Sequence, residues 1–360
     1  MIGFQRSVPD GSAMSAGQIE RELARLRINE DGAVGARASV LNLIAVTDEE
    51  AAQDVAQAIC ELSRHYPSRA IFMISDPDEG EANLEIGLSA FCVERGGSGN
   101  QVCAEQITVH VEGPPARYLE SLAGPLLIPD LPVFLWYPNG DVPRSPECDG
   151  MAALADRLVL DSAAAGDCEA FLRGVTNLLG EGGLPAVGDL RWAALSPWRS
   201  LAANLFAPPE RAGEIEKIRR VEIVYHKANE CQALLFTGWL SSALGWRPEW
   251  MERTEDGRTF GFVGPSGEVR VELDLDASGA SLGRVRLFSE ELTFEMRTSR
   301  SGEHAEACST VMRGDEPVSE RTVHLGFSDV GLLLGEEIKL LGRDAPYESA
   351  LVQAVRMLDS

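Results

Sequence analysis

"VLNLIAVTDEEAAQDVAQAICELSRHYPSRAIFMIS", residues 40–75, is the stretch that decides the fold. It begins with a near-continuous apolar run, 40–48, which is typical of a strand buried on both faces. Asp48 is placed to cap a helix predicted over 49–65, and the apolar run 69–75 predicts a second buried strand. A strand, a helix and a strand in this order predict parallel pairing with a right-handed crossover.

The chain up to about residue 206 continues in the same style. Two alternating segments split by a turn-rich loop predict an antiparallel hairpin, 84–94 with 103–113. Apolar runs predict further buried strands at 131–138 and 157–163. Periodic segments predict helices at 115–127, 150–156 and 168–180, the last closed by Gly180.

A Pro-containing, charged segment at 207–217 predicts a domain boundary. The remainder predicts strands at 218–226, 258–264, 267–276, 283–290 and 292–299, and helices at 228–246, 328–342 and 347–358. We therefore expect an α/β protein with a flexible tail over residues 1–14 and an N-terminal domain over 15–210. That domain is Rossmann-like, with a mostly parallel sheet and flanking helices. The C-terminal domain, 211–360, is α+β with a mainly antiparallel sheet.

The composition favours a folded, acidic protein. The 360 residues are 44% hydrophobic and carry a formal net charge of −24. Such a charge argues against non-specific binding to nucleic acid or to an anionic membrane. It suits a protein that docks on a basic patch of a partner.

The expected location is the cytoplasm. The first 18 residues lack the apolar core of a signal peptide, and the apolar run 231–246 is too short and too polar to span a bilayer. Seven cysteines lie scattered, with no CxxC pair, which favours a reducing compartment.

The sequence contains none of the common local motifs of catalysis or nucleotide binding. The sequence has no phosphate loop, no GxGxxG after the first strand, no GxSxG and no HExxH. The first strand leads into "TDEEAA", and acidic residues at a helix start repel phosphate. We therefore expect no cofactor, no metal and no catalytic residues.

The α/β layout nevertheless selects positions, because ligands of open α/β sheets bind beyond the carboxyl ends of the strands. Those ends carry Thr47, Asp48, Ser75, Asp76, Trp136, Tyr137, Asp161 and Ser162. Their alternative role is to cap helices and form turns. His65 and Ser68 come just before the second strand. His65 suits a helix C-terminus, whereas Arg69 at the start of a buried strand needs a charged partner.

"DLRWAALSPWRSLAANLF", residues 189–206, concentrates two tryptophans and two arginines. Ser196 and Pro197 predict a helix start, and Trp198 lies on the apolar stripe of that helix, so Pro197 and Trp198 are expected to be structural anchors. Arg191 and Trp192 are predicted to alternate in an extended segment, with Asp189 as an ion-pair partner of Arg191. Arg191 and Arg199 then suit either an anionic ligand or structural salt bridges.

These stretches together resemble the glucose-6-phosphate dehydrogenase assembly protein family, OpcA. The resemblance runs over roughly residues 39–206, through "VLNLIAVTDEE", "HYPSRAI", "PLLIPDLPVFLWYPNG", "VLDSA" and "DLRWAALSPWRSLAANLF", and more weakly beyond. The motif residues that carry over as candidate binding positions are His65, Ser68, Arg69, Trp136, Asp161, Asp189, Arg191, Trp192 and Arg199. Pro197 and Trp198 also belong to the motif, as structural anchors.

The resemblance implies a non-catalytic partner that binds glucose-6-phosphate dehydrogenase, promotes its active oligomer and activates it in the oxidative pentose phosphate pathway. The chain has no closely spaced cysteine pair, which argues against the thiol switch of photosynthetic relatives. Two other hypotheses stay open. One is a sugar-phosphate binding protein or enzyme with its site at the strand ends and Arg191 and Arg199 on the phosphate. The other is an interaction module for a different protein.

Overall fold

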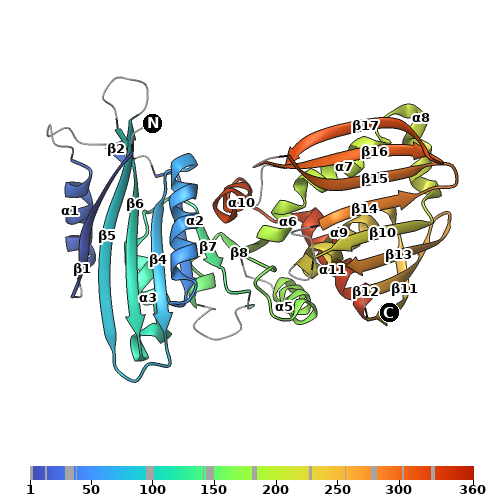
Figure 1. Cartoon of the computed structure of the whole chain (residues 1–360). Coiled ribbons are helices and arrows are strands. Elements are labelled where there is room, and N and C mark those ends of the chain that lie inside the picture. Colours follow the sequence, from blue (N-terminus) through green and yellow to red (C-terminus); the bar gives the residue numbers. More distant parts are fainter. Residues whose placement is uncertain are drawn as a thin grey trace. The chain divides into compact units, whose positions relative to one another are not determined.

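The structure is a computed structural model of the chain. It describes residues 3–12, 14–28, 36–37, 39–94, 101–140, 142, 150–180, 185–226, 229–255, 257–276, 282–301, 304–325 and 329–360. The chain folds into two compact units, which Figure 1 shows together. Unit 1 comprises Met1–Asp161, Gly183–Gly188 and Asp329–Arg343, and unit 2 comprises Ser162–Gly182, Asp189–Ser328 and Asp344–Ser360.

Unit 1 is built on a nine-stranded sheet in the order β1-β5-β6-β4-β3-β7-β8-β9, with β2 beside β6. Strands β3, β4, β6, β7 and β8 pair in parallel, whereas β1 and β5 pair antiparallel. The mostly parallel sheet is thus confirmed. The strands are β1 (Gly3–Ser12), β2 (Ala36–Arg37), β3 (Asn42–Thr47), β4 (Arg69–Asp76), β5 (Asn83–Glu94), β6 (Gln101–Glu112), β7 (Val133–Tyr137), β8 (Arg157–Leu160) and β9 (Ala186–Asp189).

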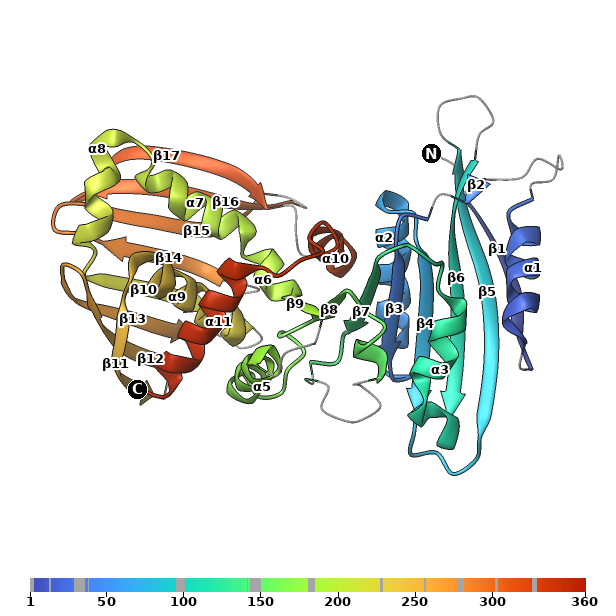
Figure 2. The same cartoon turned by 180° about the vertical axis from the view of Figure 1, so that it is seen from behind.

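Helices cover both faces of this sheet. Helix α2 (Ala52–His65) lies in front of it in Figure 1, and α3 (Leu119–Ala123) lies in front in the reverse view of Figure 2. Helix α10 (Val330–Glu337) packs on α2, closely enough that a Cβ at Gly331 would lie 2.7 Å from the Ala58 carbonyl oxygen. Helix α1 (Ala16–Leu26) completes the unit beside β5.

Unit 2 carries an eight-stranded sheet in the order β11-β12-β13-β10-β14-β15-β16-β17. Every neighbouring pair is antiparallel except β10 with β13, so the predicted mainly antiparallel sheet is confirmed. The strands are β10 (Arg220–Tyr225), β11 (Arg247–Thr254), β12 (Gly257–Gly264), β13 (Gly267–Leu275), β14 (Leu282–Phe288), β15 (Thr293–Ser301), β16 (His304–Arg313) and β17 (Glu316–Leu325).

The helices of unit 2 gather on one face of its sheet, the face seen in Figure 2. They are α5 (Cys168–Gly180), α6 (Leu190–Ala194), α7 (Ser196–Phe206), α8 (Pro209–Ala212), α9 (Glu230–Leu244) and α11 (Ala345–Leu358). In α9 the eight residues from Cys231 to Gly238 are all buried, which explains why its apolar residues are not confined to one side of the helix. At Gly238 a Cβ would lie 2.1 Å from the Ala350 carbonyl oxygen of α11, so the two helices are in backbone contact.

No helix within the described residues is long and apolar enough to cross a bilayer. Helix α9 is buried over most of its length, as its sequence predicted.

Several segments differ from the sequence-based expectation. Residues 3–12 pair with β5 as β1, where a tail was predicted. The two units also do not divide near residue 210, because α5 packs on α9 and α11 and the helix predicted over 328–342 includes α10, which packs on α2.

Among the cysteines that the structure describes, four form disulfides that spacing along the chain did not predict. Cys92 and Cys103 face each other in the antiparallel register of β5 and β6. Cys168 at the start of α5 joins Cys231 in α9, across 63 residues of chain. Tertiary packing, which sequence spacing does not reveal, brings each pair together.

Candidate functional site

The tryptophan–arginine stretch forms a packed cluster within unit 2. The Arg199 guanidinium lies 3.5 Å from the centroid of the Trp192 ring and also donates to the Ser196 hydroxyl at 3.0 Å. The Trp192 indole nitrogen donates to Asp344 at 2.8 Å, and its ring lies 5.6 Å from that of Tyr347. The cluster joins α6, α7 and the start of α11, so its contacts hold these helices together.

The local structure of this stretch corrects the predicted extended segment. Residues 190–194 form α6, and Asp189 is its N-cap, accepting from the backbone amides of Arg191 at 2.9 Å and Ser162 at 3.1 Å. Asp189 is fully buried, and its carboxylate accepts from these backbone amides. The ion pair with the Arg191 side chain stays a prediction. Pro197 lies in the first turn of α7, and Trp198 is buried on the inner side of that helix.

Arg69 in unit 1 is buried, with a side chain only 1% exposed, and it has three partners. It pairs with Glu105 of β6 at 2.6 Å, with Glu20 of α1, and donates to the Leu126 carbonyl at 3.1 Å. Burial alone would lower the pKa of Arg69, but the hydrogen bond to Glu20 and the charge of Glu105 together raise it. The charged partner that a buried arginine requires is therefore present, and Arg69 joins α1 to the sheet.

The other unit 1 candidates are dispersed. Ser68 and Trp136 are buried inside the unit, and Asp161 is 8% exposed just after β8. His65 ends α2 with a largely exposed ring, 3.5 Å from the Glu61 carboxylate. Among the candidates of unit 1, His65 is thus the one whose side chain is open to a partner.

The place where α/β sheets usually bind ligands is bridged by protein side chains. In unit 1 the strand order reverses between β3 and β7, so a ligand would lie beyond the ends of these two strands. There the Thr47 hydroxyl donates to Asn139 at 3.1 Å, and the Asn139 amide donates to Asp48 at 2.8 Å. Asp48 also accepts from the Ala51 amide just before α2. A phosphate at this position would meet a carboxylate instead of free amides.

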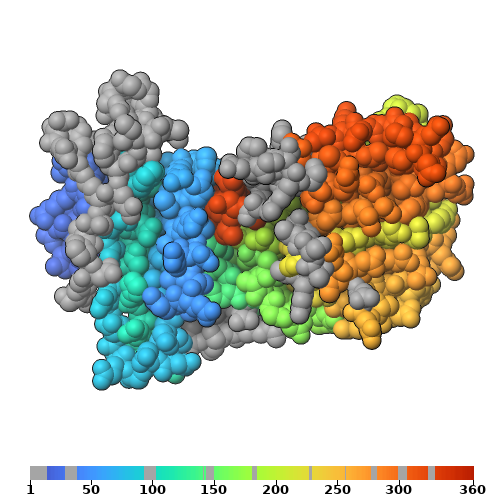
Figure 3. Space-filling model, viewed as in Figure 1, coloured from blue at the N-terminus to red at the C-terminus, as the bar shows by residue number. Residues whose placement is uncertain are grey.

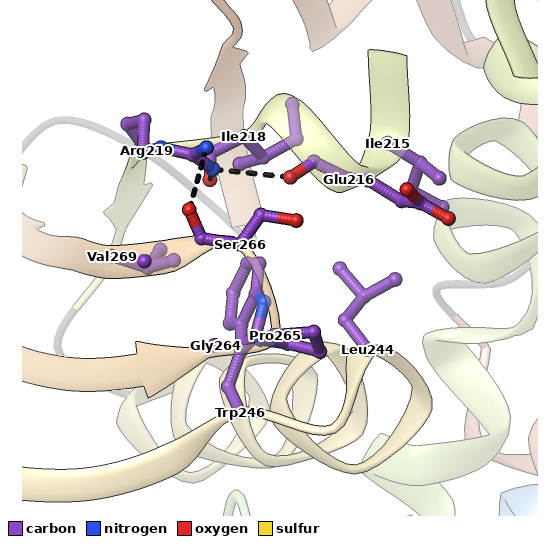
Figure 4. Close-up of a pocket in the computed structure, with 11 residues that line it drawn as sticks. Ile215, Glu216, Ile218, Arg219, Leu244, Trp246, Gly264, Pro265, Ser266 and Val269 are labelled. Carbon is purple, nitrogen blue, oxygen red and sulfur yellow. Dashed lines mark hydrogen bonds between the residues drawn. The ribbon is translucent and has the colours of Figure 1, made fainter. Parts of the chain in front are cut away.

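Described residues of unit 2 line at least two hollows. The first, shown in Figure 4, encloses about 50 Å³ beside Trp246. Its Arg219 guanidinium is bound to backbone carbonyls, among them that of Ser266 at 2.9 Å. This volume is far below the several hundred Å³ of a typical ligand pocket. The second hollow, about 520 Å³ and wide open, lies over β14 to β17 and is lined in part by Arg286, Phe288 and Met312.

The second hollow belongs to a sheet face that the sequence did not single out. Alternate residues of β10, β13, β14 and β15 are buried against the helices, and the residues between them point away from the helices. That outward side is hereafter the outer face. Figure 3 shows it without a covering helix of unit 2. The alternation within each strand was readable from the sequence, but the pairing of strands that makes the face was not.

These features define a two-unit α/β protein whose Rossmann-like sheet is bridged at the ligand position. By fold it is similar to solved oxidoreductases. One is a 3-ketoreductase from Actinomadura kijaniata in complex with TDP-benzene and NADP, with a TM-score of 0.51 at 12% identity over 89% of this chain and 96% of that one. Another is an aldose-aldose oxidoreductase from Caulobacter crescentus, with a TM-score of 0.50 at 13% identity over 89% of this chain and 95% of that one. Likenesses this distant show the fold alone.

The chain belongs to the OpcA family. Residues 60–177 match its "Glucose-6-phosphate dehydrogenase subunit N-terminal domain", and residues 185–351 match the corresponding C-terminal domain. A protein of Nostoc punctiforme named OpcA, of the OxPP cycle, is 27% identical over 81% of this chain. One of the same name from Synechocystis is 30% identical over 47% of it. The chain spans 65% and 36% of the length of these two relatives.

Proposed function

We propose that this protein binds glucose-6-phosphate dehydrogenase, promotes its active oligomer and so activates it, without catalytic chemistry of its own. The observation that carries the proposal is the pair of family matches, both described as domains of a glucose-6-phosphate dehydrogenase subunit. Activation follows if the protein binds the active form of the enzyme more tightly than the inactive form. The net charge of −24 supports electrostatic docking on a basic surface.

The bridge at the strand ends supports a role that does not rest on a bound nucleotide. Asp48 accepts hydrogen bonds from the Asn139 side-chain amide and from the Ala51 backbone amide just before α2. Opening that position to phosphate would break these hydrogen bonds and place like charges together. The proposed binding of the dehydrogenase then uses the protein's outer surface and not the strand ends.

The test adds the purified protein to the dehydrogenase of the same organism. Light scattering after size exclusion reports the oligomer, and initial rates report the KM and kcat. We expect a larger dehydrogenase assembly and a lower KM or higher kcat, with binding that weakens as salt rises. A matched control is an unrelated protein of similar size and negative charge. Unchanged oligomer and rates at micromolar excess of both proteins, across a range of salt, would overturn the proposal.

The sugar-phosphate hypothesis remains a separate prediction, and no observation favours it. Arg199 is stacked on Trp192 and bonded to Ser196. Thermal shift with glucose 6-phosphate, on the wild type and on Arg191→Ala, decides it. A stabilisation that the variant loses would support a phosphate site, and no stabilisation would dismiss it.

A further inference from the structure

We propose that the outer face of the unit 2 sheet is where a second copy of this chain binds, giving a twofold dimer. The proposal goes beyond the proposed function and does not depend on it. It rests on how charged and apolar side chains are arranged in rows across the strands.

The strand register aligns the outward side chains in three neighbouring rows. The middle row runs Glu272, Glu222, Arg286, Glu295. The row on one side runs Arg270, Arg220, Phe288, and the row on the other side runs Asp274, Val224, Arg284, Arg297. The middle row is therefore mainly acidic, and each row beside it is mainly basic.

Within one copy, ion pairs connect the side chains of these rows. Arg286 contacts Glu295 at 2.7 Å and Glu222 at 3.5 Å, and Arg220 contacts Glu222 at 3.2 Å. These side chains keep 18–45% of their surface exposed, so each retains capacity for a further partner. Arg220 also lies over the Phe288 ring, 4.1 Å from its centroid.

The charge balance of the three rows favours a second copy as the occupant. Over these four strands they hold five arginines and four carboxylates, and the middle row continues to Glu252 on β11 and Glu320 on β17. The set stays near neutral in a chain with a net charge of −24. Two copies of so acidic a chain repel each other over most surfaces, but not over this one. Neighbouring rows lie about 7 Å apart along the strands, so a shift by one row places the acidic row of one copy over a basic row of the other. A basic partner would instead be drawn to the acidic surfaces elsewhere.

Size and composition agree with this occupant. Eight strands of 6–10 residues, about 4.8 Å apart, span an area of about 1000 Å². A stable interface needs about 800 Å² from each partner. Arginine and aromatic residues, which are enriched in interfaces, supply Arg220, Arg286, Phe288 and the 43%-exposed Trp250, whose ring covers Gly261 of β12. A twofold interface uses the same patch on both copies, which a self-complementary face allows.

The test measures mass by light scattering from 1 to ~100 µM, a range that brackets the affinity of ordinary dimers. We expect the wild type to approach twice the 38.9 kDa chain mass. Arg220→Glu/Arg286→Glu makes the rows acidic, and Glu222→Arg/Glu295→Arg makes them basic. Each variant alone should weaken self-association at least tenfold, and an equimolar mixture should restore the doubled mass.

Matched controls separate self-association from misfolding. Arg173→Glu reverses an arginine of α5 that pairs with Asp359 in the same unit, and should leave the mass unchanged. Circular dichroism and the unfolding midpoint verify that each variant is folded. In the wild type, the exposed Cys60 on α2 of unit 1 should be alkylated at the same rate at every concentration, which verifies that the protein stays folded across the range.

Three outcomes would overturn the proposal. One is a wild type at 38.9 kDa throughout the range. Another is a doubled mass that both charge-reversed variants retain. The third is a monomeric wild type whose charge-reversed variants lose binding to the dehydrogenase, which would assign the outer face to that enzyme.

Discussion

The disulfide between Cys168 and Cys231 should contribute a large part of the stability of unit 2. It closes a loop of 63 residues, and the loss of chain entropy in the unfolded state then stabilises the fold by about 4 kcal/mol. The Cys92–Cys103 disulfide of unit 1 closes only 11 residues, for which the same relation gives about 3 kcal/mol. Both values follow from sequence separation alone, so they can be compared directly.

The assay is guanidinium unfolding of oxidised protein, followed by tryptophan fluorescence. Five of the six tryptophans lie in unit 2, so the signal reports mainly that unit. Cys168→Ala/Cys231→Ala should lower the free energy of unfolding of unit 2 by about 4 kcal/mol. Reduction with dithiothreitol should lower the free energy of unfolding of unit 2 in the wild type by a similar amount. It should change the unit 2 signal of the variant little.

The control is Cys60→Ala/Cys308→Ala, which removes two cysteines that form no disulfide. It should leave the response to dithiothreitol intact. The reasoning fails if the oxidised double variant loses less than about 1 kcal/mol, or if reduction destabilises unit 2 of the variant as much as that of the wild type.

Three further substitutions test the tertiary contacts. Arg69→Met should cost about 3 kcal/mol in urea unfolding, because the buried Glu105 loses Arg69 and keeps only Arg27 as a charged partner. A loss below about 1 kcal/mol would contradict this role of Arg69. Trp192→Phe removes the indole donor to Asp344 and should lower the free energy of urea unfolding by about 1.5–3 kcal/mol. An unchanged free energy would mean that the aromatic ring, and not the hydrogen bond, stabilises the cluster. Hydrogen bonds from neighbouring lysine and serine side chains hold the pKa of Glu214 below its usual value, so its contribution is present at neutral pH and is lost as pH falls through that lowered pKa. Glu214→Gln should therefore destabilise at pH 7 and flatten the acid limb of the stability profile, and an unchanged acid limb would refute this.

The parallel core of unit 1 was predictable because its signals are local and strong. The runs 40–48 and 69–75 flank an amphipathic helix, and β3, α2 and β4 follow them closely. Strands β16 and β17 were missed for an equally local reason. The buried positions of β16 are Ala307, Cys308, Ser309 and Val311, a consecutive mixture of small, polar and apolar residues without a clear alternation. Strand β17 at the sheet edge has mostly polar, exposed residues.

The candidate residues show where sequence reasoning ends. Five residues are too few for periodicity to separate a helix from a strand, so α6 was assigned an extended form, although Asp189 is a good N-cap. Arg199 lies beside the apolar stripe of α7, and only the packing of α6 on α7 places it over Trp192. The rows of the outer face depend on the register between β10 and strands up to about 70 residues further along the chain. No window of sequence contains that information.

The bridged strand ends bear on how a fold shared with NADP-bound reductases can serve a different role. In such sheets, phosphate binds because a helix start offers free amides and a positive dipole. Here Asp48 occupies the amide of Ala51, and Glu49 and Glu50 add negative charge at the same helix start. Replacing these acids with glycines would be needed to approach a phosphate cradle, and Asn139 would lose its partner in the process. Under the proposed function the fold persists while binding uses surfaces elsewhere, and Asp48 at this exposed helix start keeps its hydrogen bonds within the chain.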